Sequence, residues 1–191
     1  MANIAQPFNL FMTMEVHSKF ETQLINDHIV GWLRDYATNA KAKGFVVGIS
    51  GGIDSALTST LCAQTGLPTL CVEMPIHQAE SHVSRAKEHI TWLKGKFENV
   101  SSVETDLTST FTHFKKQVPK GSTQVVTDHT EANTRSRLRM ITLYYHAGIH
   151  GFIVAGTGNK VEDFGVGFYT KYGDGGVDVS PIADLTKTEV R

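Results

Sequence analysis

The stretch FVVGISGGIDS at residues 45–55 decides the fold. Its first part, residues 45–49, is short and continuously apolar, which is typical of a strand that is buried on both faces. The glycines and hydroxyl residues that follow mark a turn into a helix, which we expect at residues 54–64. The stretch therefore predicts a parallel sheet that helices cover.

Strands and helices alternate on both sides of this stretch. Residues 18–42 have the apolar spacing of an amphipathic helix, and Ser18 with Glu21 has the pattern of a capping box. Further strands are expected at 69–74, 100–103 and 152–155, and further helices at 81–97, 107–117 and 131–147. Connections long enough to hold a helix predict the α/β class, with a doubly wound, Rossmann-like parallel sheet and helices on both faces.

Two segments are longer than ordinary connections. Residues 118–130 and 165–181 are polar or glycine-rich, and loops of this length are usually functional or disordered. The last residues, 186–191, have the pattern of a helix that has just begun. We therefore expect a single domain over residues 1–191, with a C-terminal part that continues beyond residue 191.

The composition argues against several classes of function. Lys and Arg number 18 against 19 Asp and Glu, so the net charge of −1 provides no general field for DNA or RNA. No apolar run reaches the roughly 18 residues of a membrane span, and the N-terminus lacks the basic region of a secretory signal. Cys62 and Cys71 lie in apolar stretches and indicate buried thiols in a reducing compartment. We expect a cytoplasmic protein without nucleic-acid or membrane partners.

The loop at residues 50–55 has the composition of an anion-binding cradle. Two adjacent glycines let the backbone approach a phosphate, the following helix presents free N–H groups, and two serines add hydroxyl donors. Asp54 would repel a phosphate unless a cation lay between them, which predicts Mg²⁺ at this position. An ordinary turn, with Asp54 as an acid that stabilises the helix start, is the alternative.

The sequence of this loop excludes a Walker A motif, which would end in Gly-Lys-Ser or Gly-Lys-Thr. SGGIDS instead resembles the pyrophosphate-binding loop of the ATP pyrophosphatases, which have an adenine nucleotide alpha-hydrolase-like fold. Members of that superfamily cleave ATP to AMP and pyrophosphate while they adenylate a substrate. The resemblance implies the chemistry and leaves the substrate open.

Three later segments add polar groups. Arg135 and Arg139 should share one helical face and Arg137 should lie on another, with a solvated basic face as the alternative. The segment GTGNKVE at residues 156–162 follows the last expected strand and should converge on the same nucleotide, unless it is an ordinary capped turn. FYTKYGDGGVD at residues 168–178 suits a loop that closes over a flat, charged ligand, or a disordered connector.

Taken in this order, the four segments resemble the NAD synthetase family over residues 45–191, and its ammonia-dependent members in particular. The resemblance implies a ligase that forms a carbon–nitrogen bond. ATP would convert the nicotinate carboxylate of deamido-NAD to an acyl-adenylate with release of pyrophosphate. Ammonia would then displace AMP to give NAD, while residues 165–181 close over the intermediate and exclude water.

The same resemblance assigns roles to residues. Asp54 and Glu162 would hold Mg²⁺, and Asp54 and Lys187 would be catalytic. Arg137, Lys171 and Asp178 would contact deamido-NAD. ATP would be bound by Thr157, by Lys187 and by the loop residues Gly48, Ile49, Ser50, Gly51, Gly52, Ile53, Asp54 and Ser55.

Several expectations concern partners. No amidohydrolase segment precedes the first helix, so free ammonia is the expected nitrogen donor, although GNK at residues 158–160 is similar to glutamine-dependent members. A separate glutaminase subunit is the alternative. Family members form homodimers, and the resemblance implies one here. They also run beyond position 191 and supply a later Thr and a His-Lys pair, so either the gene product is longer or this chain is catalytically impaired.

Two rival functions come from other classes. One is another ATP pyrophosphatase, either GMP synthetase-like or tRNA-modifying, although the sequence lacks the basic patch or cysteine pair typical of the tRNA enzymes. The other is a nucleotide-binding module without catalysis.

Overall fold

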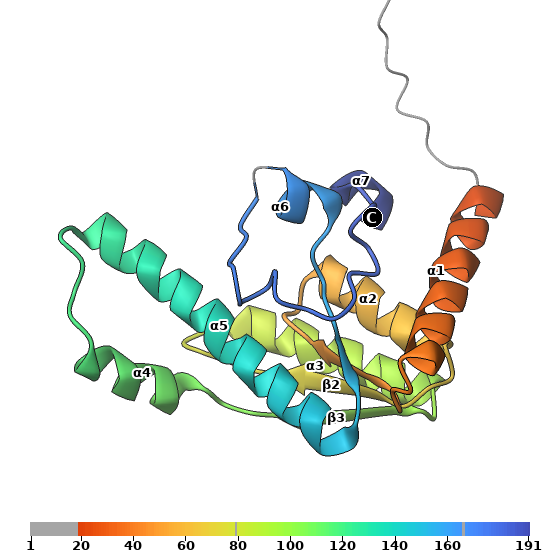
Figure 1. Ribbon diagram of the computed structural model, residues 1–191, viewed down its shortest axis with the longest axis horizontal. Coiled ribbons are helices and arrows are strands. Elements are labelled where there is room, and N and C mark those ends of the chain that lie inside the picture. The colour runs from red at the N-terminus through yellow and green to blue at the C-terminus, as the bar shows by residue number, and fades with distance from the viewer. Residues whose placement is uncertain (1–18, 79, 166) are drawn as a thin grey trace, which may run out of the picture.

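The computed structural model describes residues 19–78, 80–165 and 167–191. A parallel sheet in the order β3-β2-β1-β4 forms its centre (Figure 1). The strands are β1 (Phe45–Gly48), β2 (Thr69–Glu73), β3 (Val100–Glu104) and β4 (Ile153–Ala155). From β1 the chain winds outward through β2 to β3 and then returns to the other side of β1 for β4. The doubly wound expectation is confirmed, and β1 with β4 marks the point where the winding reverses, which is where such sheets bind ligands.

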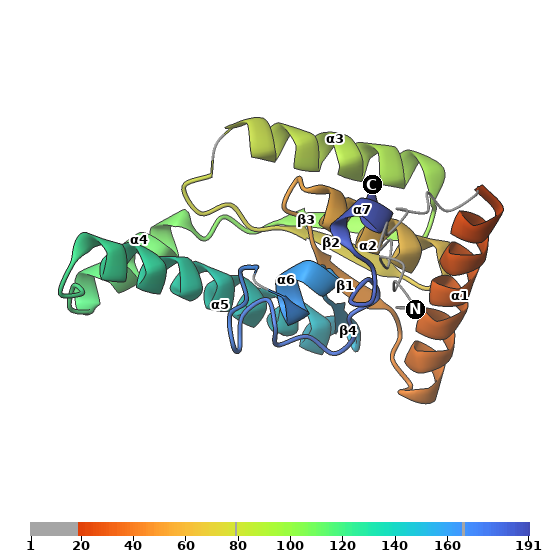
Figure 2. The ribbon, with the colours of Figure 1, turned by 90° about the horizontal axis from the view of Figure 1, so that it is seen from above.

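Helices cover both faces of the sheet (Figures 1 and 2). They are α1 (Lys19–Asn39), α2 (Ile53–Gln64), α3 (Glu80–Lys96), α4 (Thr108–Gln117), α5 (Gln124–His150), α6 (Lys160–Phe164) and α7 (Lys187–Val190). Helices α2 and α3 lie on one face, α4 and α5 lie on the other, and α1 packs against α2.

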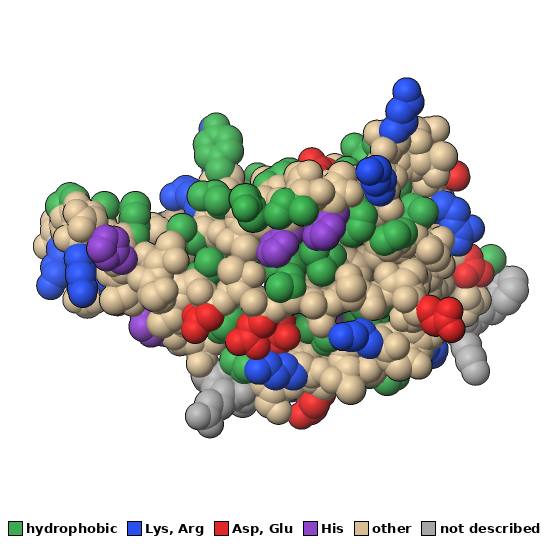
Figure 3. Space-filling view, turned by 90° about the horizontal axis from the view of Figure 1, so that it is seen from below, with side chains coloured by type: hydrophobic (Ala, Val, Ile, Leu, Met, Phe, Trp, Pro, Cys, Tyr) green, Lys and Arg blue, Asp and Glu red, His purple; other side chains and the backbone are tan. Residues whose placement is uncertain are grey.

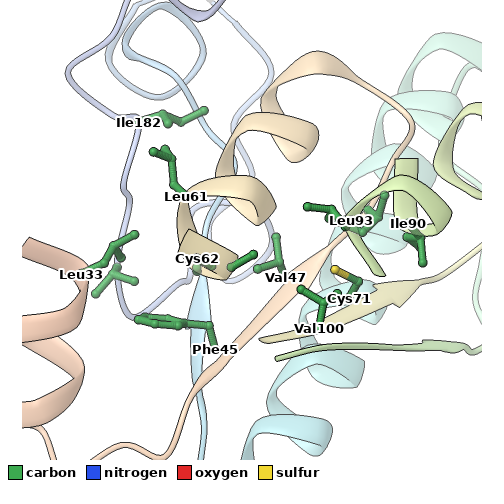
Figure 4. Close-up of a cluster of buried hydrophobic side chains, with 14 of the residues drawn as sticks. Leu33, Phe45, Val47, Leu61, Cys62, Cys71, Ile90, Leu93, Val100 and Ile182 are labelled. Carbon is green, nitrogen blue, oxygen red and sulfur yellow. The ribbon is translucent and has the colours of Figure 1, made fainter. Parts of the chain in front are cut away.

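Each face of the sheet has its own apolar core, because alternate residues of a strand point to opposite faces. Val47 and Cys71 pack with Leu61 of α2 and Leu93 of α3 on one face (Figure 4). Val46 belongs to the core on the face covered by α4 and α5. The continuously apolar strands are therefore explained by burial on both sides.

The cysteines are buried and free, as the sequence indicates. Burial raises the pKa of the Cys71 thiol to about 12, with a further contribution from Glu73. Burial also raises the pKa of Cys62 well above its usual range. Neither thiol is a nucleophile at neutral pH, because the reactive species is the thiolate.

The long helix differs most from expectation. The prediction of a helix at 131–147 is wrong at its start, because α5 begins at Gln124, so part of the expected loop at 118–130 is helical. The hydroxyl of Thr123 accepts a hydrogen bond from the N–H of Val126 at 3.2 Å and caps the helix. The first turns of α5 project from the sheet and lack an apolar stripe, so hydrophobic periodicity gives no sign of them.

The remaining expectations concern the ends of segments. Ser18, the expected cap of α1, lies outside the described residues. The described part of residues 165–181 contains turns and one bridge, Ala155 to Val179, which adds to the edge of the sheet. Helix α7 starts with a reciprocal capping box between Thr186 and Glu189, which confirms the expected helix start. No helix in the described ranges is long and apolar enough to cross a membrane.

Candidate active site

The loop after β1 forms the floor of the site. Ser55 donates a hydrogen bond from Oγ to the carbonyl of Gly52 at 2.9 Å, and the Oγ atoms of Ser50 and Ser55 lie 3.2 Å apart. Gly51 has φ of 80°, a left-handed conformation that favours glycine. Helix α2 begins at Ile53, so its free N–H groups open onto this loop. The loop therefore has the backbone N–H groups and serine hydroxyls that an anion site uses.

Three charged side chains from separate helices meet beside this loop. Asp54 lies in the first turn of α2, Glu162 lies in the first turn of α6, and Lys187 is the first residue of α7. Lys187 Nζ donates hydrogen bonds to Asp54 Oδ2 and, at 3.3 Å, to Glu162 Oε1. The structure therefore brings together the residues that the sequence assigns to the metal and to catalysis.

Asn159 links the carboxylate of Asp54 to the backbone of Glu162, and the sequence did not assign it a role. Its side chain is fully buried. Oδ1 accepts hydrogen bonds from the N–H groups of Val161 at 3.0 Å and Glu162 at 3.2 Å, so it caps α6. This orients Nδ2 toward Asp54 Oδ1, 3.0 Å away. An N-x-x-E pattern could have indicated the cap, but not the contact with a residue 105 positions earlier.

The charge balance keeps Lys187 protonated. Partial burial disfavours its charged form, but the hydrogen bonds to Asp54 and Glu162 and the charges of these acids outweigh that effect, so the pKa of Lys187 is raised. Two carboxylates thus share one cation, which leaves the group with a net charge of −1. The pair would otherwise repel each other.

The donor set fits a magnesium ion that arrives with phosphate. Mg²⁺ prefers oxygen ligands and is usually held by one or two carboxylates plus substrate phosphates and water. Asp54 and Glu162 supply two carboxylates that approach one cation position. No group of three or more His, Cys, Asp or Glu side chains in the described residues could hold a metal ion. The residues present therefore fit an ion whose remaining ligands are phosphate and water.

A cavity of about 510 Å³ lies above the loops that follow β1 and β4. Gly48, Ile49, Ser50, Thr157 and Glu162 belong to its lining. Of the predicted ATP residues, these early loop positions and Thr157 therefore share one cavity. Asp54 and Lys187 are not in its lining, but Lys187 contacts both Asp54 and the lining residue Glu162.

Two arginines of α5 form part of the cavity wall. Arg135 and Arg139 line it and Arg137 does not, which confirms that they lie on different helical faces. Arg139 donates from Nε to the carbonyl of Met74 at 3.1 Å, and burial followed by the charge of Arg135 lowers the pKa of Arg139. Arg135 lies over the buried ring of Phe111, 5.2 Å from its centroid. A solvated basic face therefore describes Arg137 alone.

The segment after α6 is tied to α5 at several points. The carboxylate of Asp174 accepts hydrogen bonds from Ser136 Oγ at 2.5 Å and from the N–H of Thr170 at 3.1 Å. Thr170 donates from Oγ1 to Asn133 Oδ1 at 2.7 Å. Side-chain contacts thus hold this loop in place against the helix, and Asp174 and Phe168 extend the cavity wall.

The three residues predicted to contact deamido-NAD lie outside the cavity lining. Arg137 donates from Nε to the carbonyl of Lys171 at 3.1 Å, so these two are neighbours on the exposed side of the loop. Asp178 lies apart from them. Its carboxylate accepts from the N–H of Val154 at 2.8 Å and from the hydroxyl of Tyr144 at 2.9 Å. These contacts give Asp178 an observed role in anchoring the loop to β4 and α5.

Asp163 is a further acid of the cavity that the sequence did not single out. Burial, followed by the charges of Asp174 and Glu162, raises the pKa of its carboxyl. A Cβ atom on Gly158 would collide with this carboxylate, so glycine is required there for Asp163 to pack against the loop.

Comparisons with known proteins show the family of the chain and support its fold. The family model described as NAD synthase matches residues 25–191. NH(3)-dependent NAD(+) synthetase from Malacoplasma penetrans is 38% identical over 87% of this chain and 64% of its own length. The same enzyme from Methanosarcina mazei is 39% identical over 86% of this chain and 62% of its own length. The chain therefore spans less than two thirds of these relatives.

Two solved structures have a similar fold. NH3-dependent NAD synthetase from Campylobacter jejuni, in complex with the nitrate ion, superposes with a TM-score of 0.77 and is 30% identical, over 88% of this chain and 70% of that chain. NMN synthetase from Francisella tularensis superposes with a TM-score of 0.78 and is 34% identical, over 88% of this chain and 67% of that chain.

Proposed function

Because the chain belongs to the NAD synthase family, we propose that it is a ligase that uses ATP to amidate deamido-NAD with ammonia, giving NAD, AMP and pyrophosphate. The observation that carries this proposal is the meeting of Asp54, Glu162 and Lys187 beside the loop after β1. A carboxylate is a poor electrophile, so amide formation requires that one of its oxygens become a leaving group. Transfer of AMP from ATP accomplishes this.

In the first step, a nicotinate carboxylate oxygen attacks the α-phosphorus of ATP, and the bond to pyrophosphate breaks. The N–H groups at the start of α2 and the ammonium of Lys187 stabilise the charge that develops on the phosphate oxygens. Asp54 and Glu162 would hold magnesium, which would supply further neutralisation of phosphate charge. Ser50 and Thr157 also line the cavity, and we assign them to phosphate binding.

In the second step, ammonia attacks the carbonyl of the acyl-adenylate and AMP leaves. Water is the competing nucleophile in this step, so the intermediate needs protection from solvent. We assign this protection to residues 165–181, whose contacts with α5 through Asp174 and Thr170 support a position above the cavity. Free ammonia is the proposed donor, and a separate glutaminase subunit is the alternative source.

We assign deamido-NAD to the exposed side of the loop, where Arg137 and Lys171 are neighbours. Both are cations, as the pyrophosphate of a dinucleotide requires. Asp178 would complete this site or hold the loop that forms it. The location next to the cavity would let the nicotinate end enter while the rest of the dinucleotide stays outside.

A homodimer is supported by the outer surface of α5. Ile141, Tyr145 and Ile149 recur at every fourth position, and their exposed fractions are 66%, 70% and 61%. Figure 3 shows apolar side chains gathered along this helix on the lower face of the molecule. Contiguous apolar surface of this kind marks an interface in many proteins. The proposed location of the enzyme is the cytoplasm, where its free thiols stay reduced.

A reconstituted reaction tests the proposal. The protein is incubated with ATP, Mg²⁺, ammonium and deamido-NAD, and NAD, AMP and pyrophosphate are quantified. We expect the three products in equal amounts and none when deamido-NAD is left out. Absence of NAD from well-folded protein would favour a nucleotide-binding module without catalysis. Replacing ammonium with glutamine, with and without an added glutaminase, tests the nitrogen source.

One relative supports a second candidate substrate. The structurally similar protein from Francisella tularensis is named an NMN synthetase. Nicotinate mononucleotide would offer the same carboxylate with a single phosphate. Competition between equal concentrations of mononucleotide and dinucleotide decides between the two, and we expect deamido-NAD to be consumed first.

A further inference from the structure

Lys187 lies where two carboxylates would otherwise face each other. Its ammonium contacts Asp54 Oδ2 and Glu162 Oε1, and no other residue donates to both of these acids within the described ranges. The side chain of Asp54 is only 14% exposed, so water screens its charge poorly. The two acids therefore need a cation, and in this structure the protein provides it.

The same two carboxylates are the proposed ligands of magnesium. An ammonium ion and a divalent cation cannot both lie between them, because each would occupy the point where Asp54 Oδ2 and Glu162 Oε1 converge. Binding of the metal must therefore displace the ammonium.

We propose that Lys187 is an internal competitor for the metal position, which it occupies without nucleotide and leaves when metal and nucleotide bind together. This inference rests on the proposed function for the identity of the metal and the nucleotide. Under this proposal, stable binding of the metal requires that the nucleotide bind with it. A metal ion alone must displace a bound ammonium, whereas a metal–nucleotide complex gives that ammonium phosphate oxygens to bind.

The positions of the three side chains allow such an exchange. Asp54 is held by Asn159, which also caps the helix that carries Glu162, so the carboxylate of Asp54 and the backbone of Glu162 keep their places. Lys187 has a flexible four-carbon stem and is 36% exposed, so its ammonium has open space beside it.

The backbone around Lys187 needs no movement for this exchange. The capping box of Thr186 and buried Val190 fix α7 in place. A change of side-chain rotamer is therefore sufficient to carry the ammonium from the carboxylates to a nearby phosphate.

A permanent ion pair is the competing explanation. In that case Lys187 would help to hold Asp54 and Glu162 together in every state, and its removal would weaken metal binding whether or not nucleotide is present. The exchange makes the opposite prediction for the nucleotide-free protein. The sign of the change therefore separates the two explanations.

Manganese is the probe for the experiment, because it also prefers oxygen ligands and its unbound fraction is measured by electron paramagnetic resonance. Without nucleotide, Lys187→Met should bind Mn²⁺ about tenfold more tightly than the unchanged protein, a typical size for coupling between sites. Lys187→Arg keeps the cation and should bind it as weakly as the unchanged protein does. Lys160→Met is the matched control, because it removes a neighbouring positive charge that no described contact links to either acid, and we expect less than about a twofold change.

The second arm repeats the titration with a non-hydrolysable ATP analogue. Lys187→Met should now bind the manganese–analogue complex more weakly than the unchanged protein does, because the ammonium is missing from the phosphates. Tighter binding without nucleotide and weaker binding with it would be the signature of the exchange. Unchanged or weaker Mn²⁺ binding by Lys187→Met without nucleotide would overturn it.

The two proposals can fail separately. Far-ultraviolet circular dichroism checks that each variant is folded, and Lys187→Gln replaces Lys187→Met if the latter is not. Neither titration measures turnover, so a protein that exchanges cations but makes no NAD would refute the function and keep the exchange. If the protein makes NAD while Lys187→Met and Lys187→Gln gain no Mn²⁺ affinity, the exchange is refuted and the proposed function is kept.

Discussion

Asn159 donates a hydrogen bond from Nδ2 to Oδ1 of Asp54 at 3.0 Å, which joins the loop after β4 to the helix after β1. The other end of the same amide caps α6 and so sets the position of Glu162. One buried side chain therefore contacts the carboxylate of Asp54 and fixes the backbone from which Glu162, the other acid that we assign to magnesium, extends. We regard Asn159 as a positioning residue, since it acts on the substrates through these acids.

Asn159→Ser should separate the two functions of this amide. Serine still caps a helix, but it has no amide group to reach Asp54. We expect the free energy of unfolding to fall by about 1–3 kcal/mol, because a buried hydrogen bond to a charged group is lost. The Mg²⁺ concentration for half-maximal pyrophosphate release should rise roughly 10-fold or more, as for the loss of a residue that orients a metal ligand. Urea unfolding and a magnesium titration of the reaction measure these two effects.

Asn99 supplies the control for that experiment. Its Nδ2 donates to the carbonyls of Ala63 and Leu67 at 2.9 and 2.7 Å, far from the candidate site. Asn99→Ser should lower the free energy of unfolding by about 1 kcal/mol and leave the magnesium dependence unchanged. If Asn159→Ser gave the same pattern as Asn99→Ser, Asn159 would have only a structural role.

Asp54→Ala should abolish pyrophosphate release while the protein stays folded. The carboxylate touches Lys187 and Asn159 and makes no contact in either apolar core. Its loss also removes an acid from the first turn of α2, at a cost of about 0.3–1 kcal/mol. Asp35→Ala, on the exposed side of α1, is the matched control and should keep full activity. Normal turnover by Asp54→Ala would contradict the metal assignment.

The sequence predicted the architecture because burial requires apolar residues at regular positions along each helix and strand. Strands buried on both faces appear as apolar runs, and their carboxyl ends must meet at one edge of a parallel sheet. The expectation that residues 50–55 and 156–162 converge followed from that rule, whereas the pairing of Asp54 with Glu162 came from the resemblance to a family. The bond from Lys187 to Asp54 spans 133 positions and has no periodic signature, so only the resemblance to a family suggested that Lys187 acts at this site.

Other features could not be predicted from the sequence, because their sequence patterns are compatible with more than one structure. Asn159 has the pattern of an ordinary helix cap, and its second hydrogen bond is a tertiary contact. The first turns of α5 are mostly polar, and the exposed Val125 and Val126 are adjacent in sequence and give no apolar stripe, so the pattern indicates a loop. Asp178 lies in a glycine-rich segment typical of ligand binding, yet its carboxylate accepts two hydrogen bonds from within the protein.

Asp178→Ala tests whether this residue anchors the loop. The substitution leaves the N–H of Val154 and the hydroxyl of Tyr144 without their partner. We expect the free energy of unfolding to fall by about 1–3 kcal/mol, since unpaired donors cost more than a lost bond between exposed groups. Tyr144→Phe removes only one of the two bonds and should cost less, about 0.5–1 kcal/mol. Urea unfolding of both variants provides the comparison.

Substrate kinetics on the same variants show whether Asp178 also contacts deamido-NAD. An anchor alone predicts that Asp178→Ala and Tyr144→Phe raise the KM for deamido-NAD in proportion to their effects on stability. Direct contact predicts a KM for Asp178→Ala that rises well beyond that proportion. A variant with unchanged stability and a raised KM would assign Asp178 to the substrate alone.

His89 should make stability depend on pH. Its Nε2 lies 2.9 Å from Ser59 Oγ, and its ring stacks on Trp92, with centroids 5.8 Å apart. Burial lowers the pKa of His89 below 6.5, so just below that pH the unfolded chain binds the proton more readily than the folded protein does. The contribution of neutral His89 to stability is therefore fully present above about pH 6.5 and is lost as the pH falls through its folded pKa.

His89→Gln isolates this contribution. Glutamine keeps an amide that can hydrogen-bond Ser59 but does not titrate, so the variant should lose stability less steeply than the unchanged protein as the pH falls from 7.5 to 5.5. Burial also lowers the pKa of His146, so both proteins should lose some stability over this range, and the difference between them reports His89. Urea unfolding at several pH values measures that difference. If it were the same at every pH, the neutral state of His89 would contribute nothing to the packing of α3 on α2.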